Sequence, residues 1–448
     1  MNANSRTRRK LRVLVRRHGP SSPVWRRRAA MGTGAILVGL VALLFADMAN
    51  EAIALFRAHI AAIWWLPLIV TPAGVVAIAV ATRRFTPEGR GSGIPQVIAA
   101  TRDPEDAVET LISLRVGIAK LLMTAAGLLA GASVGREGPT VQVSAAIMSR
   151  VHRLFSVPVT AGVIIAGGAA GVAGAFNTPL AGVAFAIEEL ANAFEQRVAL
   201  LVMTAILIAG IVSLGLAGDY VYFGTMPATI SLARTLVIAP VAGILGGLSG
   251  GLFARLVLAI TYNRERYLGP FANRPIAWAL LCGILIALIG IATQVTWGTG
   301  YAEAKAAVEG AHETLWFGPG KFAATLLSTV AGLPGGIFSP SLATGAGVGN
   351  LLCLLFPNDP RGAVVLLGMV AYFTGVVRAP LTAVIIIVEA TASRGMILPL
   401  FASALIADSS ARLVCRHKLY HALAREFLSR SGPAQPGEEG RMRSPRAT

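Results

Sequence analysis

The sequence predicts an all-α polytopic membrane protein, and its composition carries most of that prediction. Of 448 residues, 55% are hydrophobic and only 14% are charged, and the mean hydropathy is +0.67. A soluble domain carries roughly 25% charged residues. Uncharged runs of at least 18 residues recur along the chain, close to the about 20 that a membrane-spanning helix needs. In chain order these runs cover residues 29–46, 60–82, 154–187, 198–218, 235–254, 275–302 and 322–358.

Positive charge is concentrated at the two ends of the chain. The formal net charge is +17, and residues 1–28 hold ten Arg or Lys and no acid. The C-terminal stretches RLVCRHK and RMRSPR are also basic. A basic arm could bind nucleic acid, but basic flanks beside apolar spans are typical of cytoplasmic ends. We therefore expect a multi-pass cell-membrane protein (inner membrane if the source is bacterial), surrounded by lipid, with both termini cytoplasmic and no nucleic-acid partner.

The domain organisation follows from these shifts in composition. Residues 1–28 form a basic cytoplasmic segment, residues 29–425 form one transmembrane domain, and residues 426–448 form a polar, Pro/Gly-rich tail that we expect to be disordered. The three cysteines lie far apart and have neither metal-ligand nor disulfide spacing. We therefore expect no metal and no cofactor.

An internal repeat relates the two halves of the domain, about 29–215 and 233–415, at a constant offset of 201 residues. The stretch GGAAGVAGAFNTPLAGVAFAIEE (167–189) aligns without gaps on GMVAYFTGVVRAPLTAVIIIVEA (368–390). Both copies hold a Pro-Leu pair followed by a Glu nine positions after the proline. Duplicated halves are typical of transporters, whose site lies near the repeat interface. The sequence leaves open whether the halves are parallel or inverted.

Glycine and proline interrupt the apolar runs at three motifs: GSGIP (91–95), GREGP (135–139) and GIFSP (336–340). Proline is well placed in the first turn of a helix, so each motif predicts a loop that leads into a new helix. Irregular backbone inside a membrane is tolerated only where it is buried in protein or lines a cavity. Helix N-termini carry unpaired N–H groups and a partial positive charge. If they converge, the three motifs can form an anion site.

These motifs, in this order and spacing, resemble the CLC family of chloride channels and proton/chloride exchangers. The resemblance covers about residues 30–425 and includes the segment LYHALARE near the end of the domain. It implies two inverted halves of tilted, often broken helices in a homodimer with one pathway per subunit. It also implies a transporter of chloride and protons rather than an enzyme. The prokaryotic type, without regulatory nucleotide-binding domains, is the expected one.

The resemblance assigns four chloride-binding residues. Ser92 matches the serine of the central anion site, and a serine there is typical of chloride-preferring members. Ile337 and Phe338 match residues whose backbone N–H groups hold the same anion. Tyr420 matches the tyrosine whose hydroxyl closes the site on the cytoplasmic side. Without the family, these residues would be interpreted as a turn residue, two core side chains and an interfacial tyrosine.

Two glutamates match the proton-handling residues of the family. Glu137 matches the gating glutamate, whose carboxylate occupies the outer anion site and leaves it when protonated. Its neighbour Arg136 would support the outer entrance, although the residues alone are equally consistent with a buried Arg–Glu ion pair. Glu189 matches the internal proton glutamate, whereas Glu188 is expected to be structural because its counterpart recurs in the other half. Lys120, in the middle of a span, matches a buried family lysine.

Three alternatives remain open. The first is a passive voltage- or pH-gated chloride channel of the same family, which would not need an acid at Glu189. The second is a fluoride-selective relative, against which Ser92 and Tyr420 argue. The third is an intramembrane serine protease built on Ser249 in GLSGG, which would need a histidine base within reach. Since each histidine lies near charges or segment ends, the protease is the weakest of the three.

Overall fold

The computed structural model describes residues 23–191, 196–218 and 221–428. Most of the basic segment 1–28 and nearly all of the tail 426–448 lie outside these residues. Within the described ranges the chain is built of helices, and the one strand-like pairing there is a bridge between Gly135 and Gly336.

The first half of the chain extends from α2 to α10. Its α-helices are α2 (Pro23–Ala62), α3 (Pro67–Phe85), α4 (Ile94–Arg102), α5 (Pro104–Thr110), α6 (Leu114–Leu129), α7 (Glu137–Leu154), α8 (Ala161–Phe176), α9 (Pro179–Phe185) and α10 (Gln196–Ala217). A 3-10 turn, η1 (Pro87–Gly89), precedes α4, and a π-helical turn, η2 (Ala186–Leu190), continues α9.

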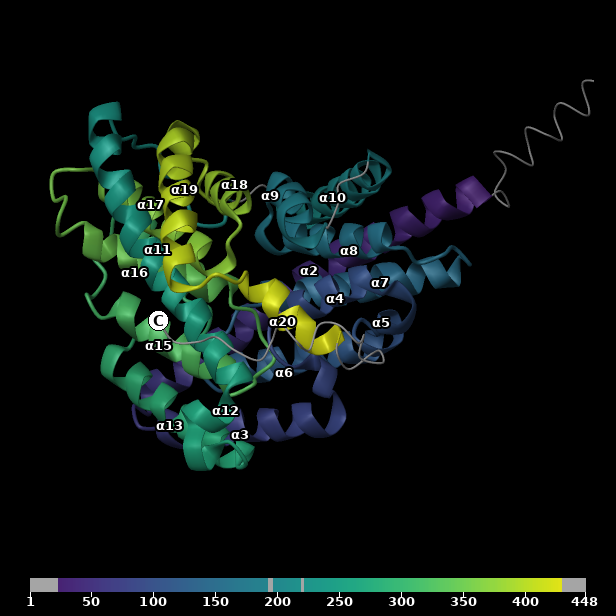
Figure 1. Ribbon diagram of the computed structural model, residues 1–448, viewed down its shortest axis with the longest axis horizontal. Coiled ribbons are helices and arrows are strands. Elements are labelled where there is room, and N and C mark those ends of the chain that lie inside the picture. The colour runs from purple at the N-terminus through teal and green to yellow at the C-terminus, as the bar shows by residue number, and fades with distance from the viewer. Residues whose placement is uncertain (1–22, 192–195, 219–220, 429–448) are drawn as a thin grey trace, which may run out of the picture.

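The second half extends from α11 to α20. Its α-helices are α11 (Leu232–Tyr262), α12 (Arg264–Leu268), α13 (Pro275–Thr293), α14 (Tyr301–Val308), α15 (Phe317–Val330), α16 (Phe338–Leu352), α17 (Arg361–Val377), α18 (Pro380–Thr391), α19 (Ile397–Val414) and α20 (Leu419–Leu428). Two 3-10 turns, η3 (Gly269–Phe271) and η4 (Arg394–Met396), complete it. In Figure 1 most of the first half lies to the right and most of the second to the left, with the yellow α20 crossing between them. There α20 packs on α4, α11 and α17.

The two halves meet through an antiparallel bridge between equivalent residues. Gly135 N–H donates to Gly336 O at 2.6 Å, and Gly336 N–H donates to Gly135 O at 2.7 Å. These residues are separated by the 201-residue offset of the repeat, so a local two-fold axis passes between them. The chain directions at this bridge are opposed, as expected for the inverted halves that the family resemblance implies.

A second pair of contacts obeys the same two-fold relation. The Glu188 carboxylate accepts hydrogen bonds from the backbone N–H groups of Leu381 (3.2 Å) and Thr382 (2.8 Å), at the start of α18. The Glu389 carboxylate accepts equivalent bonds from Leu180 (3.1 Å) and Ala181 (2.7 Å), at the start of α9. Each half thus caps a helix of the other half with a negative charge, as the dipole of a helix start favours.

Loss of one of these caps should destabilise the fold measurably. We expect Glu389→Ala to lower the free energy of unfolding by about 2 kcal/mol, because two N–H groups lose a charged acceptor. Thermal unfolding in detergent measures the effect, and Glu265→Ala, at an exposed acid, is the matched control. An unchanged midpoint for Glu389→Ala would show that the cross-cap carries no stability.

Glycines let the helices of the second half pack closely. In α11, a Cβ on Gly246 would lie 2.5 Å from Ala371 Cβ of α17, and one on Gly247 would lie 2.5 Å from Ala407 O of α19. Close approach of small residues is the usual way in which membrane helices associate. Ser249 belongs to the same stretch, and its hydroxyl bonds Leu245 O of its own helix at 2.7 Å.

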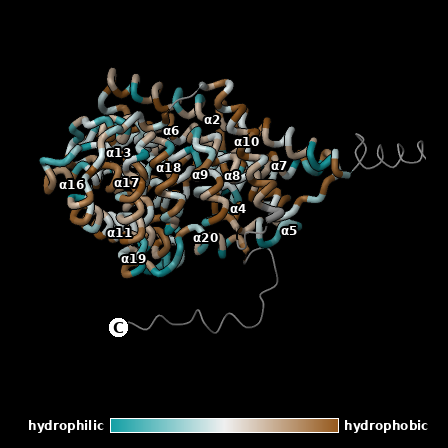
Figure 2. The backbone as a smooth tube through the Cα atoms, turned by 90° about the horizontal axis from the view of Figure 1, so that it is seen from above, coloured by the Kyte–Doolittle hydropathy of each residue, from teal (hydrophilic) through white to brown (hydrophobic). Residues whose placement is uncertain are grey.

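In two of the seven apolar runs expected to span, 154–187 and 322–358, the structure has no single helix long enough to cross a membrane. The run 154–187 holds two short helices, α8 and α9, because Asn177 is left-handed (φ 55°) and Pro179 begins a new helix. The run 322–358 is broken before α16. Six described helices are long and apolar enough to cross a membrane, and Figure 2 shows hydrophobic residues along most of the chain. The protein is therefore a multi-pass membrane protein.

Candidate functional site

The three Gly-Pro motifs converge where the two halves meet. Each leads into a helix, as predicted: α4 begins at Ile94, α7 at Glu137 and α16 at Phe338. Gly335 N–H donates to Gly91 O at 3.1 Å, which joins the first motif to the third. A Cβ on Gly138 would lie 2.4 Å from the Ser92 hydroxyl oxygen, so only glycine permits the approach of the first and second motifs.

The Glu137 carboxylate lies on the first turn of α16. It accepts a hydrogen bond from Ser339 N–H at 3.3 Å and another from the Ser339 hydroxyl. The Glu137 side chain is 1% exposed. A carboxylate thus occupies the N-terminus of a helix, the position that favours anions.

The guanidinium of Arg136 lies at the limit of ion-pair distance from this carboxylate and hydrogen-bonds other elements. It donates to Ala46 O (3.0 Å) and Asn50 Oδ1 (3.1 Å) on α2, and to the Tyr222 hydroxyl (3.3 Å). Its Nε lies 4.0 Å from Glu137 Oε1, which is too far for a hydrogen bond. The hydrogen bonds of the two adjacent charges therefore go to different elements: Arg136 joins α2 to the segment before α11, and Glu137 contacts α16.

Ser92, in the first motif, and Tyr420, in α20, lie together. Both are buried, the two side chains interact, and neither hydroxyl makes a well-formed hydrogen bond with the described residues. A buried hydroxyl without a partner is costly, so these two groups can serve as donors to a bound anion. Tyr420 also interacts with the charges of Glu137 and Glu189.

Ile337 and Phe338 begin α16 and are 4% and 1% exposed. Their N–H groups belong to the first turn of the helix, where no acceptor exists within the helix itself. The Phe338 ring packs against the rings of Phe176, Phe185 and Phe373, with centroids 5.7, 6.0 and 4.4 Å away. These contacts fix the start of α16 while its N–H groups stay available to a ligand.

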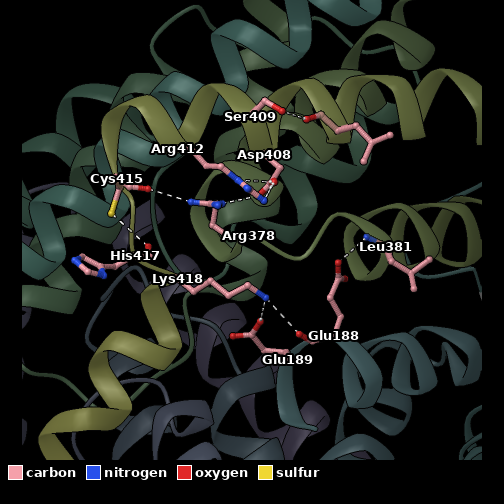
Figure 3. Close-up of polar contacts among 11 residues, drawn as sticks. Glu188, Glu189, Arg378, Leu381, Asp408, Ser409, Arg412, Cys415, His417 and Lys418 are labelled. Atoms are coloured by element: carbon pink, nitrogen blue, oxygen red, sulfur yellow. Dashed lines mark hydrogen bonds and ion pairs between the residues drawn. The ribbon is translucent and has the colours of Figure 1, made fainter. Parts of the chain in front are cut away.

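Glu189 lies in the π-helical turn η2 and is fully buried, with 0% of its side chain exposed. Neither carboxylate oxygen makes a hydrogen bond with the described residues. Its charged neighbours come from α20 and its start: Lys418 Nζ lies 3.9 Å from Oε2, and His421 Nε2 lies 3.7 Å from Oε1. Figure 3 shows the Lys418 amino group between the Glu189 carboxylate and the Glu188 carbonyl. Insertion of a π turn is frequent at functional sites.

Lys120 is fully buried in α6, and its amino group donates to Gln142 Oε1 at 2.6 Å. Its repeat counterpart, Lys321 in α15, is also buried and donates to the carbonyls of Thr296 (3.1 Å) and Gly298 (2.6 Å). Each lysine thus ties its helix to polar groups of a neighbouring segment. Lys120 holds Gln142, whose side chain lies against Gly93 of the first motif.

Sequence reasoning missed three residues of this site: Ser339, Lys418 and His421. Ser339 stands inside the GIFSP motif, so its position next to Ile337 and Phe338 was a usable signal. Lys418 and His421 flank Tyr420 in HKLYH, but nothing in the sequence indicates that this stretch packs beside Glu189.

Inverted halves, broken helices and a buried site of helix starts define an ion-transporting membrane protein. The chain belongs to the family described as voltage gated chloride channel, whose model matches residues 73–412. The resemblance to the CLC family drawn from the three motifs is thereby confirmed.

Curated relatives cover nearly the whole chain. The chain is 28% identical to the "H(+)/Cl(-) exchange transporter ClcA" of Salmonella paratyphi A over 454 residues, which covers 96% of this chain and 94% of the relative. It is 29% identical to the protein of the same name from Salmonella arizonae, with 95% and 93% covered.

Solved structures share the fold. A slow cyanobacterial Cl⁻/H⁺ antiporter superposes with a TM-score of 0.78 at 25% identity, over 90% of this chain and 98% of that one. A eukaryotic CLC transporter superposes with a TM-score of 0.72 at 24% identity, over 90% and 75%. A CLC-type fluoride/proton antiporter gives 0.72 at 23% identity, over 88% and 98%.

Proposed function

We propose that the chain is a proton-coupled chloride antiporter whose gate is the Glu137 carboxylate. The observation that carries this proposal is that this carboxylate lies on the N-terminus of α16. A chloride ion would bind the same donors, so the carboxylate and chloride compete for one position. Protonation removes the negative charge of Glu137 and with it the advantage of Glu137 at the helix start.

Chloride would bind next to this gate, between the start of α16 and the hydroxyls of Ser92 and Tyr420. The N–H groups of Ile337 and Phe338 and the two unpartnered hydroxyls are donors of the kind that an anion requires. Chloride would therefore be held by helix starts and hydroxyls without direct contact to a full positive charge, which favours rapid release.

Protons would reach the gate from the cytoplasmic side through Glu189. Burying a carboxylate fully without a hydrogen bond destabilises the protein, so its presence here indicates a functional role. The relatives and one of the solved neighbours are named as exchangers of chloride and protons, which supports coupling in this chain. The passive chloride channel is the second candidate, and Glu189 argues against it because a channel has no use for an internal acid.

One liposome experiment tests the proposal. With an outward chloride gradient, the purified protein should move protons against their own gradient, because each chloride leaving must be exchanged for protons. Chloride flux without uphill proton movement would instead establish the passive channel. Replacement of chloride by fluoride in the same assay should reduce transport if Ser92 and Tyr420 form a chloride site.

Ser92 should set the preference among anions. We expect Ser92→Pro to shift preference from chloride towards nitrate, because the side-chain donor to the central anion is lost while the backbone donors remain. Chloride and nitrate fluxes are compared in liposomes, with Ser149→Ala, a buried serine that bonds its own helix, as the control. Equal chloride-to-nitrate flux ratios in wild type and Ser92→Pro would show that Ser92 does not set the anion preference.

The setting of the protein is also part of the proposal. We expect a homodimer with one pathway per subunit, in the cell membrane (the inner membrane of a bacterium), with both termini cytoplasmic. The relatives come from bacteria, and the basic segment 1–28 favours a cytoplasmic N-terminus. Mass measurement in detergent tests the dimer, and protease access in sealed vesicles tests the orientation.

A further inference from the structure

The surroundings of Glu189 contain two groups that the mechanism above does not use. Lys418 precedes α20, and His421 lies one turn further along the chain. Their side chains are 38% and 25% exposed, whereas the Glu189 side chain is 0% exposed. Both groups therefore contact solvent at one end and the buried carboxylate at the other. The segment follows the last membrane-spanning candidate, which ends at Val414.

Lys418 and His421 together are called the proton port below. We propose that His421 carries protons from cytoplasmic water to Glu189, and that Lys418 is a positioning residue that favours the charged form of the Glu189 carboxylate and keeps it directed towards His421. This inference rests on the proposed antiport function. It adds an entry route and two residues to it.

Geometry favours His421 as the carrier. Its Nε2 lies 3.7 Å from Glu189 Oε1, and the ring also contacts the Glu189 backbone. A small approach, or one bridging water, closes that gap to a hydrogen bond. Nδ1 accepts a proton from hydronium in the cytoplasm, which leaves water, and Nε2 gives its proton to Oε1, so the ring returns to neutral. An imidazole with two nitrogens can perform both transfers without a net change of charge.

The charges around His421 keep it neutral at rest. Burial lowers the pKa of the His421 imidazole to about 4, and the cations Lys418, Arg102 and Arg425 add to this effect. The imidazolium is therefore a short-lived carrier rather than a resting state. Because the charged ring does not persist, it does not compete with Lys418 for the Glu189 carboxylate.

Lys418 supplies the charge that stabilises the acceptor. Its Nζ lies 3.9 Å from Glu189 Oε2 and donates to Glu188 O at 3.4 Å. The Glu188 carboxylate itself is engaged with the start of α18 (Figure 3). In the described residues Lys418 is thus the one lysine or arginine within ion-pair distance of Glu189. Without it, the buried carboxylate would retain its proton to higher pH.

Arg378 fixes the backbone that presents Lys418. It donates to Cys415 O at 3.1 Å and pairs with Asp408 of α19 at 2.5 Å. The turn between α19 and α20 is thereby tied to the end of α17, as Figure 3 shows. The turn that precedes Lys418 and His421 is therefore fixed by the contacts of Arg378.

The test uses the full-length protein in liposomes, with proton and chloride fluxes recorded together. Four variants are compared with wild type: His421→Gln and Lys418→Met at the port, and the matched controls His417→Gln and Arg416→Gln on the exposed side of the same turn. Symmetric buffers from about pH 5 to about pH 8 cover the range in which an imidazole and a carboxylate titrate.

We expect His421→Gln to lower the ratio of proton to chloride flux by about tenfold or more, as loss of a proton-transfer group does. We expect Lys418→Met to move the pH midpoint of proton flux upwards by about one unit, because an ion-pair partner is lost. Both control variants should keep the wild-type ratio of proton to chloride flux and the wild-type pH midpoint. Wild-type coupling in His421→Gln, or an unmoved midpoint in Lys418→Met, would overturn the inference.

A second background separates the port from a merely structural role of α20. In Glu189→Gln the proton route is absent, so adding His421→Gln or Lys418→Met should leave chloride flux unchanged. A fall in chloride flux there would show that the substitutions displace Tyr420, and would contradict the inference. If wild type itself moves no protons uphill, it is the proposed antiport that fails.

Discussion

Glu137→Gln should pass chloride at every pH without moving protons. Glutamine keeps the shape of glutamate but has no charge, so it does not compete with chloride for the start of α16. The amide also does not bind and release a proton in this pH range, so chloride and proton movements lose their link. We expect chloride flux to become independent of pH and proton flux to fall to the level of empty liposomes.

Chloride efflux and proton uptake, recorded together across a pH series, measure this effect. The matched control is Ser339→Ala, which removes the side-chain donor to Glu137 but keeps the acid. It should raise chloride flux at high pH, where the charged carboxylate otherwise blocks the site, and should keep some coupling. Strong pH dependence in Glu137→Gln would show that another group is the gate.

The helix starts of the proposed anion site were predictable because each of them follows a local sequence motif. GSGIP, GREGP and GIFSP each hold the glycine and proline that begin a helix, and the structure begins α4, α7 and α16 at or beside those residues. Their convergence was not predictable in this way, because a repeat shows which residues correspond but not which of them lie at the common axis. In the structure the bridge between Gly135 and Gly336 lies at that axis.

The orientation of the halves could not be predicted from local patterns. A sequence repeat fixes which residues correspond, but it contains no information on the direction of the axis that relates them. The cross-caps of Glu188 and Glu389 are equally non-local, because each glutamate bonds a helix about 190 to 210 residues away in the chain. Their recurrence in the repeat gave only the expectation that Glu188 is structural, which its bonds support.

Lys418 and His421 could not be predicted as site residues either, because their contacts with Glu189 are non-local. Lys418 and His421 lie more than 200 residues from Glu189 in the chain, and only the packing of α20 beside α4 brings them to it. For Arg136 and Glu137 the residues alone left an ion pair open, and the structure places the two groups 4.0 Å apart while their hydrogen bonds go to separate partners on α2 and α16.

Glu189→Gln should abolish proton transport while chloride still passes. The outer carboxylate is unchanged, so gating of chloride by Glu137 survives. The internal acceptor is gone, however, and glutamine cannot pass a proton from α20 to the gate. The matched control is the neighbouring Glu188→Gln: the Glu188 carboxylate bonds the start of α18, and its loss should reduce stability rather than coupling.

The coupling of proton to chloride flux in Glu188→Gln and Glu189→Gln tests most directly whether protons pass through Glu189 to a gate at Glu137. Chloride efflux and proton uptake are measured in the same liposomes, with a chloride gradient that opposes the proton gradient. We expect uphill proton uptake by wild type and Glu188→Gln, and chloride efflux with no uphill proton uptake by Glu189→Gln. Uphill proton uptake by Glu189→Gln at the wild-type rate would show that protons do not pass through Glu189.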